Sequence, residues 1–420
     1  MFLKRLHLSN IRCFRKAEID FDRPGGKNRK STILVGENGN GKTTILQSIA
    51  LAMAGKDAMP SLLTDVDAWV RNGADQGEIK VEIETANGEQ RDLALVLRRG
   101  ESPADVIARS ETTAEPLNDA LAHATRTYLT LAYGTSRRRS VDAARSQEVA
   151  ALYPHPRARS LASLFNREIP LNPLERWVIS LGTDDQKSIA GVVTDLVDEF
   201  LPKIAFHSIE ESGAILFDTR DGLVPLHRLG NSVQSVTAFV GDLLFQITNI
   251  FSNYRDPLKA RGLLLIDSVG VDLHPKLQRR LMDFLDTRLD NLQLVVTTQS
   301  IVLAQQARRN ALHYCLRGED GVEIFPFDGE PQKLRLNQLM MTEAFGDTTY
   351  ESLEVETMKE RYRELDDRGE DALTLSEKRE LGRIRREIGT VPRHDSAAMS
   401  AEQVELLSQV KSLLKKGEDQ

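Results

Sequence analysis

The stretch that decides the fold is "STILVGENGNGKTTILQSIALAMAG", residues 31–55. A short apolar run at residues 33–35 precedes a glycine-rich loop, and a helical pattern follows that ends near Gly55. Within it, "GENGNGKT", residues 36–43, matches the pattern G-x-x-x-x-G-K-[ST] in full. Between a strand and a helix, this pattern predicts a phosphate-binding loop. Its glycines let backbone N–H groups turn toward phosphate oxygens, and the helix start adds a partial positive charge.

The loop also predicts individual roles. Lys42 is expected to reach the β- and γ-phosphates of a nucleotide, and the Thr43 hydroxyl is expected to bind Mg²⁺. The residues predicted to bind the nucleotide are Gly36, Asn38, Gly39, Asn40, Gly41, Lys42, Thr43 and Thr44.

The second half of such a site is expected in "LLLIDSVGVDLHP", residues 263–275. Asp267 ends an apolar strand, where a carboxylate can hold Mg²⁺ directly or through water. "GLLLID" and "LQLVVTT" are predicted strands on either side of the helix "HPKLQRRLMDFLDTRL". Nearly continuous apolar strands in a strand–helix–strand unit indicate an α/β fold with a parallel sheet that is covered on both faces.

Composition bounds the class of protein. The chain has 420 residues, 40% hydrophobic and 28% charged, and a formal net charge of −7, which argues against a uniformly basic nucleic-acid coat. Cys13 and Cys315 are the only cysteines, so a disulfide framework is not expected. No apolar run is long enough to span a bilayer, and "MFLKRLHLSNIRCF" alternates like a strand rather than a signal peptide. We expect a cytoplasmic protein without a membrane partner.

Four stretches together carry a family resemblance: "LKRLHLSNIRCFRKAEIDF", "ILVGENGNGKTTILQSIA", "LLLID…LHPKLQRRLMDFLD" and "LQLVVTTQS". In this order and spacing they resemble the RecF/SMC-like branch of ABC-type ATPases. More closely, they look like stand-alone bacterial ATPases related to overcoming-lysogenisation nucleases and to the ATPase subunits of antiphage systems such as Septu. The resemblance covers roughly residues 1–330. It implies a P-loop ABC-type ATPase head with a mixed sheet, ATP and Mg²⁺ as cofactors, and a head-to-head homodimer or higher homo-oligomer.

We expect an ATPase domain at residues 1–345, with a helical insertion at about 160–200, and a helical tail at 346–420. The tail is charged and reads as three helices. Capping boxes are predicted at Thr374 with Glu377 and at Ser400 with Gln403. The tail is either packed on its own domain or an oligomer or partner interface. No TOPRIM-type nuclease domain is recognised, which points to a separate effector protein such as a nuclease.

Three positions depart from the family pattern. Ser268 stands where a glutamate normally orients the attacking water, and a serine hydroxyl is far too weak a base to replace it. Gln299 replaces the usual histidine; it can donate a hydrogen bond but cannot become cationic. The signature that acts in trans is expected in "LGNSVQS", residues 229–235, with Gly230 where serine is usual and Ser232 where glycine is usual. Asn231 or Ser232 is expected to cap the following helix.

These departures predict an ATP-binding protein whose hydrolysis is slow or absent. An alternative is an active enzyme that uses Asp272 or Asp283 as a substitute acid. The predicted function is a nucleotide-dependent scaffold or sensor that controls a partner effector in bacterial antiphage defence. The alternatives are an active RecF-like ATPase of DNA repair or processing, and an assembly protein in which nucleotide is structural.

The densest basic cluster is "SRRRSVDAARS", with Arg137, Arg138 and Arg139 as candidate nucleic-acid contacts. Three interpretations stay open: a solvated loop, a contact to nucleotide, or a contact to the DNA or RNA backbone. Gln76 is a loose candidate for a magnesium-sensing glutamine. His274 is interpreted as a residue that structures its loop before Pro275, because no second ligand lies at metal-binding spacing.

Overall fold

The structure is a computed structural model. It describes residues 2–23, 27–85, 88–109, 128–136, 143–172, 174–175, 177, 204–210, 214–250, 257–346, 352–369 and 372–390. The chain divides into two compact units, Met1–Thr348 and Thr349–Gln420, and each is described separately.

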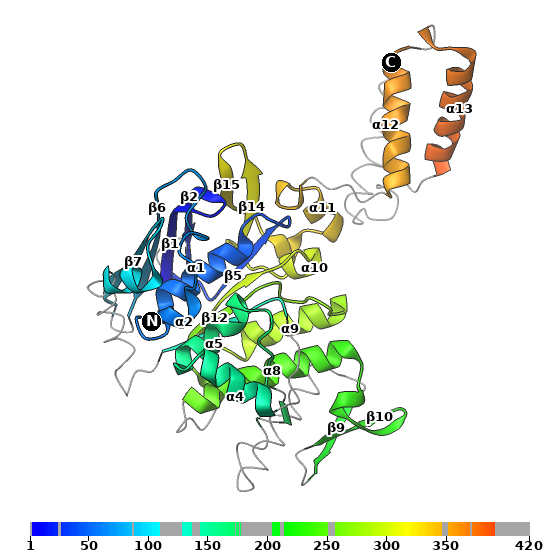
Figure 1. Ribbon diagram of the computed structural model, residues 1–420. Coiled ribbons are helices and arrows are strands. Elements are labelled where there is room, and N and C mark those ends of the chain that lie inside the picture. Colours follow the sequence, from blue (N-terminus) through cyan, green and yellow to red (C-terminus); the bar gives the residue numbers. More distant parts are fainter. Residues whose placement is uncertain are drawn as a thin grey trace. The chain divides into compact units, whose positions relative to one another are not determined.

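A six-stranded mixed sheet forms the centre of the first unit, in the order β15-β14-β5-β13-β12-β8 (Figure 1). All neighbouring strands are parallel except β15, which is antiparallel to β14. The strands are β5 (Ser31–Gly36), β8 (Leu129–Tyr133), β12 (Gly262–Ile266), β13 (Leu292–Thr297), β14 (Leu312–Gly318) and β15 (Gly321–Pro326). The predicted α/β class with a mixed sheet is confirmed.

Successive residues of the central strands point into two different cores. In β12, Leu263 and Leu265 belong to the core shared with α1, whereas Leu264 and Ile266 belong to the core shared with the later helices. Because both faces of the sheet are covered, the strand is apolar at every position, as predicted for a parallel sheet between helical layers.

An antiparallel sheet in the order β2-β1-β6-β7 covers the other side of α1 (Figure 1). Its strands are β1 (Phe2–Ile11), β2 (Phe14–Asp20), β6 (Gln76–Glu84) and β7 (Gln90–Arg98). Alternate residues are buried along β6 and in the second half of β7, as in strands with one face on a core. A separate small pair joins β3 (Asp22–Arg23) to β4 (Lys27–Asn28).

Helices fill the space around the two sheets. The core that holds α1 also contains residues of α2 and α5, and the opposite core contains residues of α8, α9, α10 and α11. The helices are α1 (Lys42–Ala54), α2 (Met59–Leu62), α4 (Ala143–Leu152), α5 (Pro156–Phe165), α8 (Asn231–Ile250), α9 (Pro275–Thr287), α10 (Ile301–Ala304) and α11 (Leu336–Met340). Short 3₁₀ turns are η1 (Leu226–Arg228), η2 (Pro257–Lys259), η3 (Pro331–Lys333) and η4 (Glu343–Phe345).

The region of the predicted helical insertion is described only at its beginning. α5 ends at Phe165, and residues 178–203 of the predicted insertion lie outside the described residues. A three-stranded antiparallel sheet follows, with β10 at its centre; its strands are β9 (Ala205–Ile209), β10 (Ile215–Thr219) and β11 (Gly222–Pro225). Strands β10 and β11 form an antiparallel hairpin, and β9 pairs with the other edge of β10.

The second unit is a helical hairpin in its described part, formed by α12 (Leu353–Asp367) and α13 (Leu375–Thr390). Its small core consists of Leu365, Leu373, Leu381 and Ile384. The predicted third helix, with the Ser400 and Gln403 box, lies outside the described residues. Throughout the part of the chain that the structure describes, no helix is long and apolar enough to cross a membrane.

Candidate nucleotide site

The phosphate loop connects β5 to α1, which begins at Lys42. Gly39 and Gly41 adopt φ angles of 83° and 73°, in the left-handed region that favours glycine. A Cβ on Gly41 would lie 2.5 Å from both the Cys13 Sγ and the Phe14 ring, and Asn40 donates its Nδ2 to the Cys315 carbonyl at 2.9 Å. The loop is therefore shaped by glycine and held between the two sheets.

The Lys42 ammonium lies inside this loop. Its Nζ donates to the Gly36 carbonyl at 2.6 Å and to the Glu37 carbonyl at 2.8 Å. Burial lowers the pKa of Lys42, and the nearby Cys315, Asp267 and Glu37 only partly oppose this effect. A cation that has lost part of its hydration interacts more strongly with a phosphate group than an exposed lysine does.

Thr43 and Asp267 meet across the ends of β5 and β12. The Thr43 hydroxyl donates to Asp267 Oδ2 at 2.7 Å, and the carboxylate is 2% exposed. These oxygens are the hard ligands that Mg²⁺ takes from proteins when nucleotide phosphates and water supply the rest. Among the described residues no group of three or more His, Cys, Asp or Glu gathers into a protein-only metal cage. The pair therefore fits a magnesium ion that arrives with a nucleotide.

Ser268 follows Asp267 in a left-handed turn with a φ of 51°. Its backbone N–H donates to the Thr297 hydroxyl at 2.7 Å, and that hydroxyl donates in turn to Asp267 Oδ1 at 2.6 Å. Thr297 thus connects both residues to the end of β13. The turn follows directly on Asp267, which contacts Thr43 of the phosphate loop, and its residue Ser268 carries no carboxylate.

The two proposed substitute acids lie in different places. Asp272 is exposed in the same loop, with a φ of 61°. Asp283 lies on α9, eight residues after Pro275. Since α9 connects two parallel strands it runs back from the loop, which puts Asp283 about 12 Å along the helix from its start. Asp272 is therefore the better positioned of the two, and Asp283 is a poor candidate.

Gln299 lies just after the end of β13 and contacts the phosphate loop. Its Nε2 donates to the Asn38 side-chain oxygen. Both side chains are exposed, so this contact is on the open side of the loop. Gln299 therefore occupies the edge where the family pattern places a histidine, and it presents a neutral donor there.

The predicted signature lies at the start of α8. This helix begins at Asn231, and the Gly230 carbonyl accepts from the backbone N–H groups of Val233 and Gln234 at 2.9 and 3.1 Å. Gly230 therefore holds the cap position, and the expectation that Asn231 or Ser232 caps the helix is wrong. The Ser232 hydroxyl donates instead to the Asp272 carbonyl at 2.9 Å, which ties α8 to the loop after Asp267.

A cationic pocket that the sequence did not predict adjoins the loop. Its volume is about 410 Å³, and Arg317 at its wall donates to the Gly39 carbonyl at 2.8 Å. Arg12 stacks 4.1 Å above the Trp69 ring and donates to Gln47 of α1 at 2.6 Å. The lining residues are Arg12, Cys13, Asp67, Ala68, Val70, Arg71, Asn72 and Arg317. Arg12, the arginine of "NIRCF", is visible in the sequence, but no pattern in the sequence indicates that it lies near Arg317.

The chain is similar to several known proteins. A family profile described as an AAA domain matches residues 5–147. Septu protein PtuA of Bacillus mycoides is 25% identical over 300 residues, which cover 71% of this chain and 38% of PtuA. The DNA replication and repair protein RecF of Rippkaea orientalis is 35% identical over 98 residues, 23% of each chain. The SMC head domain from Thermotoga maritima aligns with a TM-score of 0.43 and 14% identity, covering 78% of this chain and 100% of that chain.

The chain resembles the RecF/SMC-like branch of the ABC-type ATPases. Its fold is that of an α/β P-loop ATPase head, in which the phosphate loop follows β5 and Asp267 follows β12 of the same mixed sheet. The matched segments span well under half the length of the curated relatives, 38% of PtuA and 23% of RecF.

The remaining predicted residues do not gather at the nucleotide site within the part of the chain that the structure describes. Arg137, Arg138 and Arg139 lie outside the described residues. Gln76 is exposed at the start of β6 and does not line the pocket, whereas Arg71 does.

Structural roles fall to two further residues, Arg157 and His274. Arg157 donates to the Ala54 carbonyl at the end of α1 at 3.0 Å. His274 accepts a hydrogen bond from the Lys276 N–H and caps α9, as expected for a residue that structures its loop.

A buried acid links the predicted signature helix to the metal strand. Asp242 of α8 accepts from the Tyr133 hydroxyl at 2.9 Å, and from the backbone and side-chain N–H groups of Asn172 at 2.8 and 2.6 Å. Burial raises the pKa of both Asp242 and Tyr133. The Tyr133 carbonyl accepts the Asp267 N–H at 2.8 Å, so α8 and the magnesium aspartate are joined through one residue of β8.

Proposed function

We propose that this protein binds ATP with Mg²⁺, hydrolyses it slowly or not at all, and acts as a nucleotide-dependent scaffold or sensor. It controls a separate effector, a nuclease, in bacterial antiphage defence. The observation that carries the slow hydrolysis is Ser268, which follows a well-held metal aspartate in the turn where a water-activating carboxylate is needed. The similarity to Septu protein PtuA supports the defence role.

Different residues of the site bind different parts of the nucleotide. Backbone N–H groups of the loop and the Lys42 ammonium hold the phosphates, and Thr43 with Asp267 supplies the protein ligands for Mg²⁺. The ion, when bound, neutralises phosphate charge. Gln299 offers a neutral hydrogen-bond donor at the edge of the loop. The cationic pocket, which adjoins the loop, binds the part of the nucleotide beyond its phosphates. These groups bind and orient, but none of them removes a proton from water efficiently at pH 7.

The scaffold requires assembly. In a head-to-head homodimer, the start of α8 around Gly230–Ser232 faces the phosphate loop of the second copy. The helix start presents unpaired N–H groups and a partial positive charge toward the γ-phosphate. Closure of the dimer on ATP is the state that engages or releases the effector.

The test compares Ser268→Glu with Ser268→Gln, which has the same size but no carboxylate. Position 268 already carries a non-glycine residue at positive φ, so neither change adds a new backbone penalty. We expect wild-type turnover below about 1 s⁻¹, against ordinary enzyme rates of roughly 1–10³ s⁻¹. Ser268→Glu should raise turnover by up to ~10²–10⁴-fold, the usual contribution of a general base, and Ser268→Gln should not.

Lys42→Ala is the binding control, because it should lose the bound nucleotide altogether. Wild-type turnover well above ~1 s⁻¹ would refute slow hydrolysis and favour the active DNA-processing alternative, for which the RecF similarity is the supporting observation. The defence role is tested by phage plating efficiency in cells that carry the gene with its neighbouring genes. If Lys42→Ala leaves protection against phage unchanged, nucleotide binding does not control the effector.

A further inference from the structure

The second unit carries a segregated charge pattern on α13. Five of its side chains are exposed cations within nine residues: Lys378, Arg379, Arg383, Arg385 and Arg386. At 100° per residue, Arg379, Arg383 and Arg386 point away from the hairpin core, and Lys378 and Arg385 lie along one flank of that direction. Gly382 lies exposed among them, and a Cβ there would meet nothing within 4 Å. We call these five residues and Gly382 the α13 cationic face.

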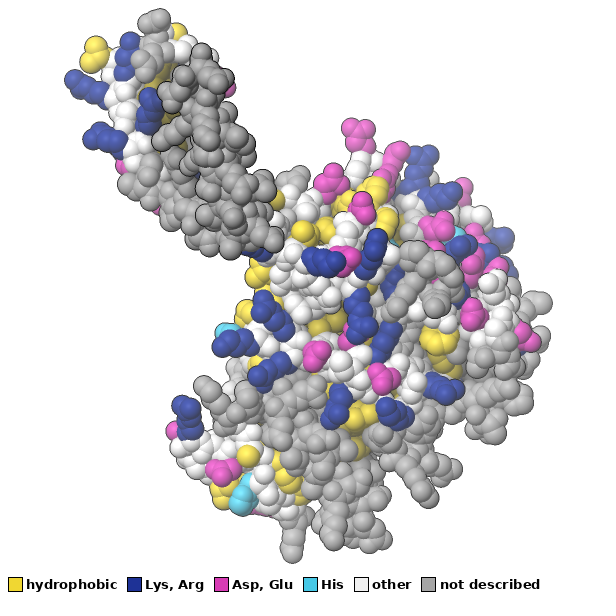
Figure 2. All heavy atoms as spheres, turned by 180° about the vertical axis from the view of Figure 1, so that it is seen from behind, with side chains coloured by type: hydrophobic (Ala, Val, Ile, Leu, Met, Phe, Trp, Pro, Cys, Tyr) yellow, Lys and Arg dark blue, Asp and Glu magenta, His cyan; other side chains and the backbone are white. Residues whose placement is uncertain are grey.

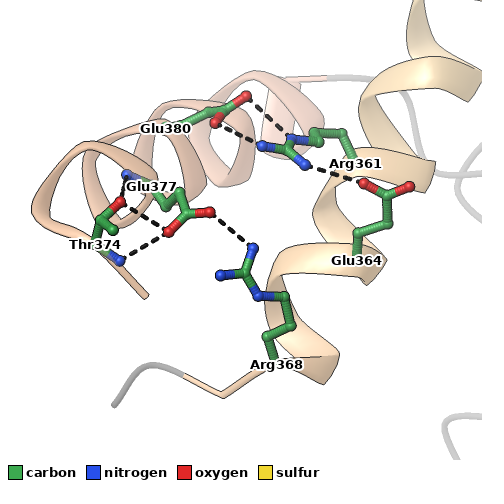
Figure 3. Close-up of polar contacts among 6 residues, drawn as sticks. All are labelled: Arg361, Glu364, Arg368, Thr374, Glu377 and Glu380. Carbon is green, nitrogen blue, oxygen red and sulfur yellow. Dashed lines mark hydrogen bonds and ion pairs between the residues drawn. The ribbon is translucent and has the colours of Figure 1, made fainter. Parts of the chain in front are cut away.

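Two of the three acids of the same helix, Glu377 and Glu380, pair with arginines of α12. Glu380 pairs with Arg361 of α12 at 3.3 Å, and Glu377 pairs with Arg368 at 2.7 Å (Figure 3). Glu377 also accepts from the backbone N–H and hydroxyl of Thr374 at 2.8 and 2.7 Å, in the predicted capping box. Folding of the hairpin therefore uses two of the three negative charges of α13 internally, whereas Glu387, near the end of the helix, is exposed.

The cations of the α13 cationic face are not neutralised in the same way. Within the described residues of this unit, none of the five forms an ion pair with a described acid, and Arg386 contacts only the Gly382 carbonyl of its own helix. Figure 2 shows Lys and Arg side chains projecting from the described part of this smaller, upper body. In a chain of net charge −7, such a local excess is not a consequence of composition.

We infer that the α13 cationic face is a binding surface for the phosphate backbone of duplex DNA. The function proposed above does not assign any role to it. From Lys378 to Arg386 the face is about 12 Å long, which is comparable to the width of the major groove of B-DNA. Four of the five cations are arginines, whose planar guanidinium groups match phosphate oxygens in a bidentate geometry.

The composition of the face decides between possible partners. A protein partner would need apolar or aromatic anchors at the centre of the patch, but the centre here is Gly382. Single-stranded nucleic acid is bound largely by stacking on aromatic side chains, and α13 contains no aromatic residue. Duplex RNA has a major groove too deep and narrow for a helix to enter. Duplex DNA is the partner that remains.

The experiment measures binding of the full chain to a short DNA duplex by fluorescence anisotropy, without ATP, at several salt concentrations. The logarithm of affinity should fall with the logarithm of salt with a slope of about −4, since each neutralised phosphate contributes about −0.9. Replacing Arg379, Arg383 and Arg386 together by glutamine should flatten the slope by about 2.7 and weaken binding by on the order of 10²-fold at 0.1 M salt. Replacing them by lysine should restore most of the binding.

The matched control replaces three exposed lysines of the first unit, Lys16, Lys56 and Lys333, by glutamine. Circular dichroism checks that each variant keeps its helices. No measurable duplex binding by the wild type, or equal losses in the control, would overturn the inference. So would tighter binding of duplex RNA, effective competition by polyglutamate, or a triple variant that changes only the oligomeric state. Because ATP is absent from this experiment, its failure leaves the proposed nucleotide switch unaffected.

Discussion

Replacing Asp242 by alanine should destabilise the first unit substantially. Asp242 is 4% exposed and accepts from the Tyr133 hydroxyl and from two N–H groups of Asn172, and it has a further hydrogen bond with the Gln246 side chain. A buried donor that loses its acceptor costs about 1–3 kcal/mol. The Tyr133 hydroxyl is fully enclosed, whereas Asn172 is half-buried and can recover part of its hydrogen bonding from water. We therefore expect a loss of about 3–5 kcal/mol in the free energy of unfolding.

Asp242→Asn is the matched variant. Its amide oxygen can still accept from Asn172, and the Tyr133 hydroxyl can rotate so that it accepts from the new amide. Burial raises the pKa of Asp242, so the ionised form is the one that folding disfavours, and a neutral amide removes that disadvantage. The loss should therefore be only about 1 kcal/mol.

Urea unfolding followed by tryptophan fluorescence measures these values. A double-mutant cycle with Tyr133→Phe isolates the tyrosine contribution: in the Asp242→Ala background, removal of the hydroxyl should recover about 1 kcal/mol or more. Because the Tyr133 carbonyl holds the Asp267 N–H, Asp242→Ala should also weaken Mg²⁺-dependent nucleotide binding. A loss below about 1 kcal/mol for Asp242→Ala, or no recovery on adding Tyr133→Phe, would refute the reasoning.

Three further predictions concern the loop, the central sheet and the tail. Gly41→Ala should lower the free energy of unfolding by about 2–5 kcal/mol, because the residue has a positive φ and its new Cβ would collide with Phe14. Gly39→Ala should lower it by only about 1–2 kcal/mol, because a Cβ there meets no other atom within 4 Å. Equal losses for the two variants in urea unfolding would contradict the packing explanation. Burial lowers the pKa of His313 to about 4 from its ordinary 6.5, so as the pH falls the imidazole is protonated in the unfolded chain before it is protonated in the folded protein. The free energy of unfolding should therefore drop by about 2 kcal/mol between pH 7 and 5. His313→Phe should remove this pH-dependent loss. Thr374→Ala should destabilise α13 by about 1 kcal/mol in hydrogen exchange, whereas the mid-helix Thr357→Ala should be close to neutral.

Local patterns predicted the elements around the site, because each short apolar strand and its adjoining loop is encoded in adjacent residues. The phosphate loop, Asp267 at the end of β12 and the Thr374 capping box were all predicted from spacing alone. Their meeting across the sheet was expected from the phosphate loop and the strand-end aspartate, and the 2.7 Å contact between Thr43 and Asp267 agrees with it.

Contacts between distant segments were not predictable in the same way. Arg12 and Arg317 share a pocket although 305 positions separate them, and no local pattern signals that pairing. The cap of α8 was assigned wrongly because Ser232 and Asn231 have good capping side chains. The tertiary contact of the Ser232 hydroxyl with the Asp272 carbonyl overrides that preference, and Gly230 takes the position.

The connection through Thr297 has an evolutionary consequence. Thr297 holds the turn after β12 by accepting from the backbone N–H of Ser268 and donating to Asp267, so the geometry of the turn does not depend on which side chain position 268 carries. A lineage can therefore exchange glutamate and serine there without rebuilding the metal site around it. Turnover and ligand holding then become separately selectable traits at position 268.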